Sequence, residues 1–364
     1  MKKYVFILCI SALLCGCKCL KTSNIRNKHT VFSVAHRGCT IDGIIPENSL
    51  AAVAYAHRYG YRAVECDPKY TADSVLVLLH DQSINRCLHY TSGYAPVIEK
   101  TFIEDLSFKE LRENYVLNSS DPSQRVPVPT LHEFLQTCRK YRILPMVHSD
   151  VYEILQKANE ETKGNFIAFG TNYDALKHIR EISDCLILWD PGQLSAEETV
   201  YRLQKIGGCC GVSSMNSKLL TADYIRTVHE AGFLVQSSIF PAPCEMQCIT
   251  DGADILLSDF HLTAAKNTKT WKTEKTGRKT LQKGECLHYS FDSTECGSME
   301  IQLVFQGEIE IIINNTYTYH IQNPSNSSII YKNGWRFYRQ TADIRITACK
   351  NTKIRTLKLK VYKY

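Results

Sequence analysis

Eight short apolar segments recur between residues 31 and 259 and alternate with amphipathic stretches such as "LHEFLQTCRKYR" and "TADYIRTVHEAG". Short apolar runs that alternate with helical patterns are typical of strands buried on both faces of a parallel sheet. The eight predicted strands are 31–35, 63–67, 144–148, 166–170, 185–190, 209–213, 233–238 and 254–259. Eight strand–helix units predict an α/β fold, a (β/α)8 TIM barrel over residues 31–264.

The sequence pattern changes after the predicted barrel. The segment "NTKTWKTEKTGRKT" is polar and basic, and we assign residues 265–279 to a linker. Residues 280–364 then alternate apolar and polar side chains, as in "MEIQLVFQ" and "TLKLKVYKY", with turn signals such as Asn333-Gly334 between several segments. This alternation predicts a small all-β, sandwich-like C-terminal domain. Its aromatic residues could be ordinary sheet residues, or they could bind a glycan or another surface ligand.

The first residues indicate export rather than part of the fold. "MKKYVFILCISALLCGC" has two lysines, an apolar stretch and small residues before a cysteine. "LCGC" resembles a bacterial lipobox, so we expect residues 1–17 to be a lipoprotein signal peptide with Cys17 lipidated, and residues 18–30 to be a tether. Cleavage without lipidation is the alternative. We therefore expect an exported protein, lipid-anchored in a bacterial cell envelope on its periplasmic or surface face.

The charge and hydropathy of the chain limit its partners. A formal charge of +6 is modest and gives no case for nucleic acid. After Cys17 no apolar run is long enough to cross a bilayer. We expect a tethered soluble protein that reaches the membrane through its lipid anchor.

Polar residues gather at the C-terminal ends of the predicted strands, where TIM barrels carry their chemistry. They include a His-Arg pair, a Glu-x-Asp pair and a His-x-Asp pair. A short hairpin predicted in "TADSVLVLLHD" brings one more histidine to this end. The residues that share this location are His36, Arg37, Glu65, Asp67, His80, His148 and Asp150.

Five motifs in the first part of the barrel identify a family. In chain order they are His36-Arg37-Gly38, Pro46-Glu47-Asn48-Ser49, Glu65-Cys66-Asp67, Thr71-Ala72-Asp73 and His80-Asp81. This series resembles the opening of the glycerophosphodiester phosphodiesterase family, within the PLC-like phosphodiesterase superfamily. "FGTNYDALKHIRE" and "DGADILLSDF" resemble later segments of the same family. The resemblance covers residues 31 to about 262 and omits the C-terminal domain.

The residue types agree with phosphodiester hydrolysis, which needs charge neutralisation and a proton for the leaving alkoxide. His36 and His80 could act as base and acid near neutral pH. Glu65 and Asp67, one residue apart at a strand end, could bind a hard divalent cation such as Ca²⁺ or Mg²⁺, which would act as a Lewis acid. Arg37 could bind the phosphate of the substrate by a charge-assisted hydrogen bond. We interpret the Pro-Glu-Asn motif as structural, starting the first helix and bracing the loop that follows the first strand.

The resemblance implies the same acid–base pair and metal ligands, and it also shows two departures. In the family, the third metal ligand is the Glu of an Ile-Glu-Ile-Lys strand, whose Lys contacts the phosphate. This chain has "MVHSD" there, which puts His148 in the metal-ligand position and Asp150 in the substrate-binding position of the lysine. A histidine in place of a carboxylate should tilt the metal preference from Ca²⁺ or Mg²⁺ toward Mn²⁺ or Zn²⁺.

These observations predict a metal-dependent phosphoric diester hydrolase that acts on glycerophosphodiesters or related lipid headgroup diesters by His/His catalysis. Two alternatives stay open. One is a non-catalytic ligand-binding lipoprotein on the same barrel, favoured by the changes at 148 and 150. The other is a phospholipase-type enzyme that acts on intact lipid.

Overall fold

The computed structural model describes residues 32–40, 44–216, 218–239, 251–259, 270–291, 297–313, 317–323, 333–337 and 342–363. The predicted signal peptide, with Cys17, and the predicted tether lie outside these residues. No helix within the described ranges is both long and apolar enough to cross a membrane.

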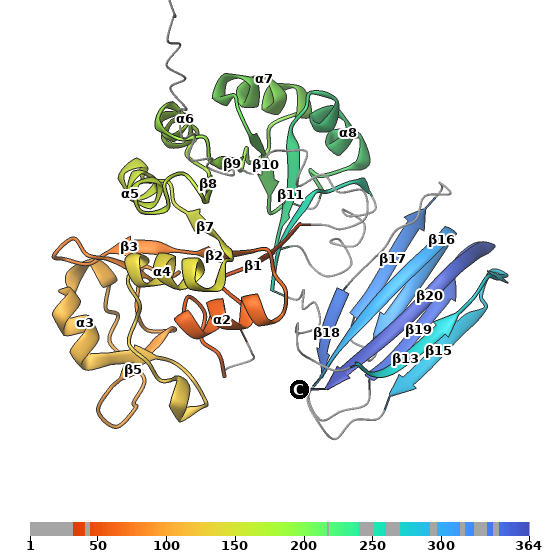
Figure 1. Cartoon of the computed structure of the whole chain (residues 1–364), viewed down its shortest axis with the longest axis horizontal. Coiled ribbons are helices and arrows are strands. Elements are labelled where there is room, and N and C mark those ends of the chain that lie inside the picture. Colours follow the sequence, from red (N-terminus) through yellow and green to blue (C-terminus); the bar gives the residue numbers. More distant parts are fainter. Residues whose placement is uncertain are drawn as a thin grey trace, which may run out of the picture.

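A closed barrel of eight parallel strands forms the first unit (Figure 1). In barrel order the strands are β1, β12, β11, β10, β9, β8, β7 and β2, and β1 closes the ring by pairing with both β12 and β2. Their bounds are β1 Phe32–Ala35, β2 Ala63–Cys66, β7 Leu144–His148, β8 Ile167–Gly170, β9 Leu186–Trp189, β10 Cys210–Ser214, β11 Leu234–Ser238 and β12 Ile255–Ser258. Each of the eight predicted strands is found, and the predicted TIM barrel is confirmed.

Helices pack around the barrel strands. They are α2 Leu50–Arg58, α4 Leu131–Tyr141, α5 Tyr152–Thr162, α6 Tyr173–Ile182, α7 Ala196–Ile206 and α8 Ala222–Glu230. All but α5 begin with a side chain that accepts a hydrogen bond from the first turn, which satisfies backbone donors that have no partner inside the helix. The capping residues are Ser49, Thr130, Asn172, Ser195 and Thr221.

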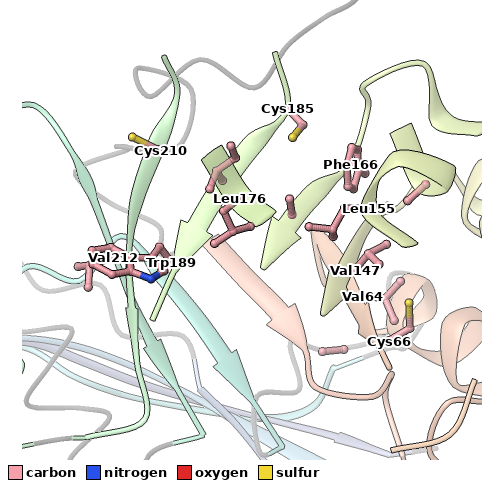
Figure 2. Packing of buried hydrophobic residues seen from close by; sticks show 14 of the residues in the cluster. Val64, Cys66, Val147, Leu155, Phe166, Leu176, Cys185, Trp189, Cys210 and Val212 are labelled. Atoms are coloured by element: carbon pink, nitrogen blue, oxygen red, sulfur yellow. The ribbon is translucent and has the colours of Figure 1, made fainter. Parts of the chain in front are cut away.

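The strands bury both of their faces, which explains their continuous apolar character. Outward-facing residues such as Val64 and Val147 pack against the helices, and Figure 2 shows them close to Leu155 of α5. Alternate residues point into the barrel because side chains of a strand alternate between its faces. The inward cluster includes Phe32, Val34, Met146, Ile167, Leu186, Leu188, Leu234, Ile255 and Leu257.

An insertion separates β2 from α4. It contains β3 (Pro68–Tyr70), β4 (Leu76–Leu78), β5 (Leu88–Tyr90), the short helix η1 (Ile103–Asp105), α3 (Phe108–Asn114), β6 (Tyr115–Leu117) and the short helix η2 (Pro122–Gln124). Strands β3 and β4 pair in antiparallel fashion and form the predicted hairpin. The insertion has its own buried cluster, which includes Leu79, Ile84 and Leu88. His80 lies two residues after β4, so the hairpin determines where this histidine lies.

The second unit is an all-β C-terminal domain, as predicted (Figure 1). Its antiparallel strands are β13 Thr270–Thr276, β14 Lys279–Leu281, β15 Cys286–Phe291, β16 Gly297–Ile313, β17 Tyr317–Asn323, β18 Asn333–Phe337, β19 Ala342–Ala348 and β20 Thr352–Lys363. The long β16 pairs with β18 and β20 along its first part and with β17 and β19 along its second. An apolar cluster that includes Phe305, Ile311 and Leu357 forms the core.

One segment differs from the expected domain organisation. Residues 270–276, which we assigned to the linker, form β13 and pair with β20. Thr273 and Lys275 are exposed, and the sequence of the segment carries no apolar alternation. Its place depends on backbone pairing with a partner more than eighty residues later, which local composition does not indicate.

Candidate active site

Glu65, Asp67 and His148 lie together at the C-terminal ends of two neighbouring strands. Strand β2 pairs in parallel with β7, with Cys66 opposite Val147, so the residues that follow these two are neighbours. Each of the three offers one ligand atom, and these atoms lie within 4.8 Å of one another. The structure therefore brings the three predicted ligands together in a group that could hold a metal ion.

Glu65 is fully buried, and only one of its two carboxylate oxygens accepts a hydrogen bond from the described residues. Its Oε2 accepts a hydrogen bond of 2.7 Å from the backbone N–H of Arg37. Its Oε1 has no hydrogen-bond partner among the described residues and lies 3.8 Å from Nδ1 of His148. Burial, and then the negative charge of Asp67, raise the pKa of Glu65 well above its ordinary value. A bound cation would offset both effects, so the unpartnered buried oxygen fits a divalent metal site.

Asn48 holds the second carboxylate in place. Its Nδ2 donates to Oδ2 of Asp67 at 2.9 Å, and its Oδ1 accepts from the backbone N–H of Asp67 at 3.1 Å. Burial alone would raise the pKa of Asp67, but hydrogen bonds from His148 and Asn48 hold it below its ordinary value. Asn48 has a left-handed backbone with φ of 54°, which asparagine tolerates better than most residues. The Pro-Glu-Asn motif thus orients a predicted metal ligand as well as starting α2.

His148 is fixed by one carboxylate and one aromatic ring. Its Nδ1 lies 3.3 Å from Oδ1 of Asp67. Its ring stacks on Phe169 of β8, with ring centroids 4.5 Å apart and an angle of 24° between the planes. The imidazole is half-buried, so one face of the group is open to the pocket described below.

A carboxylate at the end of the adjacent strand orients His36. The histidine follows β1, and its Nδ1 lies 2.7 Å from Oδ1 of Asp259, which follows the adjacent strand β12. A carboxylate oxygen accepts this bond, so Nδ1 is the donor and Nε2 is the ring atom that remains for another partner. The next residue, Arg37, donates its backbone N–H to Glu65, which links this histidine to the three-residue group.

His80 carries the same kind of orienting carboxylate. Its Nδ1 lies 2.7 Å from Oδ1 of Asp81. Arg86 donates to both oxygens of Asp81, at 2.7 and 2.9 Å, and to both oxygens of Glu47. Hydrogen bonds from Arg86, and then from His80, hold the pKa of Asp81 well below its ordinary value. Asp81 therefore stays ionised and keeps the His80 proton on Nδ1.

The side chain of Arg37 lies between two carboxylates. Its Nη1 is 3.3 Å from Glu47, and its Nε is 3.8 Å from Oδ2 of Asp67. The loop after it approaches α2 so closely that a Cβ at Gly38 would lie 2.4 Å from Cβ of Ala52. Glycine is therefore required at this position of the His-Arg-Gly motif, where φ is 85°.

A pocket of about 510 Å³ opens beside the three-residue group. It is lined by Asp67, Lys69, His80, Gln82, Glu104, His148 and Asp150, together with several apolar residues. One of the two predicted catalytic histidines and two of the three predicted metal ligands thus share one cavity. His36 is not among the lining residues and reaches the group through Arg37 and Glu65.

Asp150 lines this pocket, but neighbouring groups occupy its carboxylate. It accepts hydrogen bonds from the backbone N–H groups of Thr171 and Asn172, at 2.6 and 2.8 Å, and from the Thr171 hydroxyl at 2.6 Å. Burial opposes these bonds, yet they lower the pKa of Asp150. The observed contacts hold the loop between β8 and α6, and the predicted role in substrate binding stays a prediction.

Sequence reasoning missed several residues of this site. Asp259 belongs to the "LSDF" segment at the end of the last predicted strand, and Arg86 lies six residues after His80. Lys69 follows the Glu-x-Asp motif by two residues and lines the pocket from β3. Asp259 could have been predicted, because it is a polar residue directly after a barrel strand. The other two depend on the course of the insertion.

The fold and the site together define a class: an eight-stranded α/β barrel with a candidate metal centre and two carboxylate-oriented histidines at the C-terminal ends of its strands. Residues 36–163 match the model of the Glycerophosphoryl diester phosphodiesterase family. This match confirms the family resemblance for that part of the chain.

Two relatives illustrate the similarity. Glycerophosphodiester phosphodiesterase 1 of Homo sapiens is 29% identical over 164 residues, which is 44% of this chain and 44% of the human protein. Glycerophosphodiester phosphodiesterase of Bacillus subtilis strain 168 is 27% identical over 124 residues, 32% of this chain and 40% of that protein. The match thus spans less than half the length of either relative.

Solved structures share the fold at low sequence identity. A glycerophosphodiester phosphodiesterase from Parabacteroides distasonis superposes with a TM-score of 0.50 at 21% identity, over 64% of this chain and 94% of the other. The Oleispira antarctica phosphodiesterase, solved in complex with the product sn-glycerol-3-phosphate, has a TM-score of 0.50 at 20% identity, over 62% of this chain and 92% of the other. Both comparisons agree with the barrel described above.

Proposed function

We propose that this protein is a metal-dependent phosphoric diester hydrolase acting on glycerophosphodiesters or related lipid headgroup diesters. The observation that carries the proposal is the group of Glu65, Asp67 and His148 beside the pocket that His80 also lines. The family match and the names of the relatives support the same reaction class. The product bound to the Oleispira antarctica enzyme supports a small phosphodiester as the substrate.

In this proposal the two histidines share the proton transfers. Each has its Nδ1 on a carboxylate, at 2.7 Å in both cases, so Nε2 is the atom that accepts or donates a proton during the reaction. One ring removes a proton from the attacking water molecule, and the other protonates the leaving alkoxide, so that a phosphomonoester and an alcohol are formed. A divalent cation, when bound, would act as a Lewis acid on the non-bridging phosphoryl oxygens.

The chain's own groups prepare the ligand set. The backbone of Arg37 and the side chain of Asn48 each occupy one carboxylate oxygen, which leaves Oε1 of Glu65 and Oδ1 of Asp67 toward His148. Two carboxylates and an imidazole favour Mn²⁺ or Zn²⁺ more than an all-oxygen set does. Ca²⁺ and Mg²⁺ are the alternatives that the family resemblance implies.

Lys69 supplies the positive charge that position 150 lacks. It is half-buried on β3, and it has no ion-pair partner within the described ranges. An ammonium group in this pocket would neutralise a phosphate oxygen as charge develops on it. We therefore assign Lys69, rather than Asp150, to phosphate binding.

Replacing Lys69 by glutamine should lower kcat/KM for a glycerophosphodiester by about 10- to 100-fold, the loss of one charge-assisted hydrogen bond. Steady-state kinetics at saturating metal measures this effect. The matched control is Lys157→Gln, since Lys157 is exposed on α5 and outside the pocket. Equal kcat/KM values for the two variants would remove Lys69 from the substrate site.

The proposed function is tested with a panel of diesters. Protein lacking residues 1–17 is incubated with glycerophosphocholine, glycerophosphoethanolamine and glycerophosphoglycerol, before and after chelation. We expect release of a phosphomonoester and an alcohol, loss of turnover with the chelator, and recovery with Mn²⁺ or Zn²⁺. Turnover that persists after complete chelation would contradict the metal assignment.

The same panel separates the two alternatives. Saturable binding of a diester without turnover at any metal would identify a non-catalytic binder, which the changes at His148 and Asp150 favour. Cleavage of intact phospholipid in preference to the small diesters would identify a phospholipase-type enzyme.

We also propose that the protein is exported and lipid-anchored through Cys17 in a bacterial cell envelope. The "LCGC" sequence after the apolar segment supports this location. Incorporation of a labelled fatty acid that disappears in Cys17→Ser is the expected result, and labelling that persists in the variant would contradict it.

A further inference from the structure

The net positive charge of the chain resides in its C-terminal β domain. The whole chain has 43 basic and 37 acidic residues. Residues 270–364 contain 15 of the basic and 8 of the acidic residues, which leaves 28 basic and 29 acidic residues before them. The part that contains the barrel is therefore close to neutral, while the β domain carries a net charge of +7.

Part of this charge lies on the outer face of β20. Lys353 is exposed and Lys358 is half-buried, whereas Ile354, Leu357 and Leu359 between and beside them are buried in the domain core. Neighbouring residues of a strand point to opposite faces of a sheet, and a β-bulge that skips Arg355 in the pairing with β16 returns Lys353 and Lys358 to the same face. The two lysines thus lie on the face that points away from the core.

A like-charge pair crosses this face. Lys275 of β13 lies directly opposite Lys358 of β20 in the antiparallel register. Side chains at such positions have Cβ atoms about 4.5–5.5 Å apart, and like charges there repel. Within the described residues neither lysine has an ion-pair partner. An external anion would neutralise this repulsion.

A hollow of about 570 Å³ that is lined by basic residues lies where β14, β16 and β20 meet. Four cationic residues line it, together with Thr280, Gln306 and Ile354. The four cations are Arg278, Lys279, Lys353 and Arg355. No carboxylate belongs to the lining in the part of the chain that the structure describes. Such a hollow suits a phosphate group, which accepts hydrogen bonds from several cations at once.

Protection of a sheet edge does not explain the arrangement. Lysines are common on edge strands, where they prevent pairing with other chains. This would account for Lys275 on β13. It does not account for Lys353 and Lys358, because β20 pairs with β13 and β14 on one side and with β16 on the other.

We infer that this basic face, defined by Lys275, Arg278, Lys353 and Lys358, binds the phosphate headgroups of an anionic phospholipid membrane. A sheet face can lie along a bilayer surface, and each cation near that surface strengthens the attraction. The predicted lipid anchor would supply a second membrane signal, and two signals give stable attachment where one gives only weak binding. The inference does not depend on the proposed phosphodiesterase activity.

The test uses the chain without residues 1–17, so that no lipid anchor contributes. Sedimentation with phosphatidylglycerol–phosphatidylcholine vesicles measures the partition coefficient at low and high salt. We expect Lys275→Gln, Lys353→Gln and Lys358→Gln, combined, to lower the partition coefficient at low salt at least about tenfold. High salt should weaken wild-type binding, because it screens surface charges.

The matched control combines Lys157→Gln, Lys177→Gln and Lys205→Gln, three exposed lysines on barrel helices. It changes the net charge equally and should bind like the wild type. Thermal unfolding should show that the β-domain variant is no less stable, since it loses a repulsive pair. Equal partition coefficients of the two triple variants would overturn the inference. So would equal binding to pure phosphatidylcholine, or binding to dextran sulfate without binding to anionic vesicles, which would indicate a glycan ligand instead.

Discussion

Replacing His36 or His80 by alanine should lower the turnover of a glycerophosphodiester at least about 100-fold while the protein stays folded. Both rings have a carboxylate on Nδ1, which fixes the tautomer and presents Nε2 for proton transfer. Measured kcat values at saturating metal, with circular dichroism of each variant, check this expectation.

The matched control for this pair is His132→Ala. His132 also bonds a carboxylate through Nδ1, at 2.7 Å from Glu161, but its side chain is 64% exposed on α4, away from the pocket. It should keep wild-type turnover. Wild-type rates in both the His36 and the His80 variants would show that neither histidine moves a proton in the rate-limiting step.

The orienting carboxylates give this prediction a second readout. Asp259→Asn and Asp81→Asn leave each ring present but allow the other tautomer, because an amide can donate as well as accept. We expect a smaller loss of kcat than the alanine variants show, with little change in the substrate's KM. The loss acts through the histidines, so it should disappear when the corresponding histidine is already alanine.

The barrel was predictable because parallel strands that are buried on both faces appear in the sequence as continuous apolar runs. The Glu65-x-Asp67 pair was predictable for a related reason, since a single intervening residue returns the chain to the same face of a strand. Both inferences use only neighbours along the chain. Local sequence suffices where the structure depends on local geometry.

The contacts that the sequence did not predict join residues that are far apart along the chain. His36 meets Asp259 only because the first and last strands of the barrel pair, and the two residues are 223 positions apart. Strand β13 forms only because β20 returns beside it. Asp150 shows a different difficulty. The motif places it at the position of the family's phosphate-contacting lysine, and the structure shows its carboxylate bonded to Thr171 and Asn172. Position in a motif does not determine which partner a side chain takes.

Glu65→Gln should have opposite effects on metal affinity and on stability. Glutamine keeps the shape of the side chain and can still accept from the backbone N–H of Arg37. It removes the charge of the predicted ligand atom, so we expect metal affinity to fall at least about 100-fold. In the metal-free protein it removes a buried, unpaired oxygen beside Asp67, and its amide group can donate to that carboxylate. The free energy of unfolding should therefore rise by about 1–3 kcal/mol.

The stability difference should also depend on pH in a defined direction. The pKa of Glu65 is raised in the folded protein, so its contribution to stability is complete below the ordinary value of 4.5 and is lost as the pH rises through the folded-state pKa. The pKa of Asp67 is lowered, so its contribution is present above 3.8 and is lost as the pH falls below that value. The pH ranges in which the two contributions are lost therefore do not overlap, since one lies above 4.5 and the other below 3.8. Glutamine does not titrate, and the advantage of the variant over the wild type should therefore grow from pH 4.5 upward.

Urea unfolding of chelated wild type and Glu65→Gln at about pH 5 and about pH 8 measures this difference, and calorimetric titration with Mn²⁺ and Zn²⁺ measures the affinities. Asp223→Asn is the control, because the side chain of Asp223 is 82% exposed on α8. Unchanged metal affinity in Glu65→Gln would place the cation away from this carboxylate. A metal-free variant less stable than the wild type would mean that the buried charge is already compensated by the protein. If both expectations hold, the barrel carries a carboxylate that weakens the metal-free fold and that only a bound cation makes favourable, as a metal centre built for binding requires.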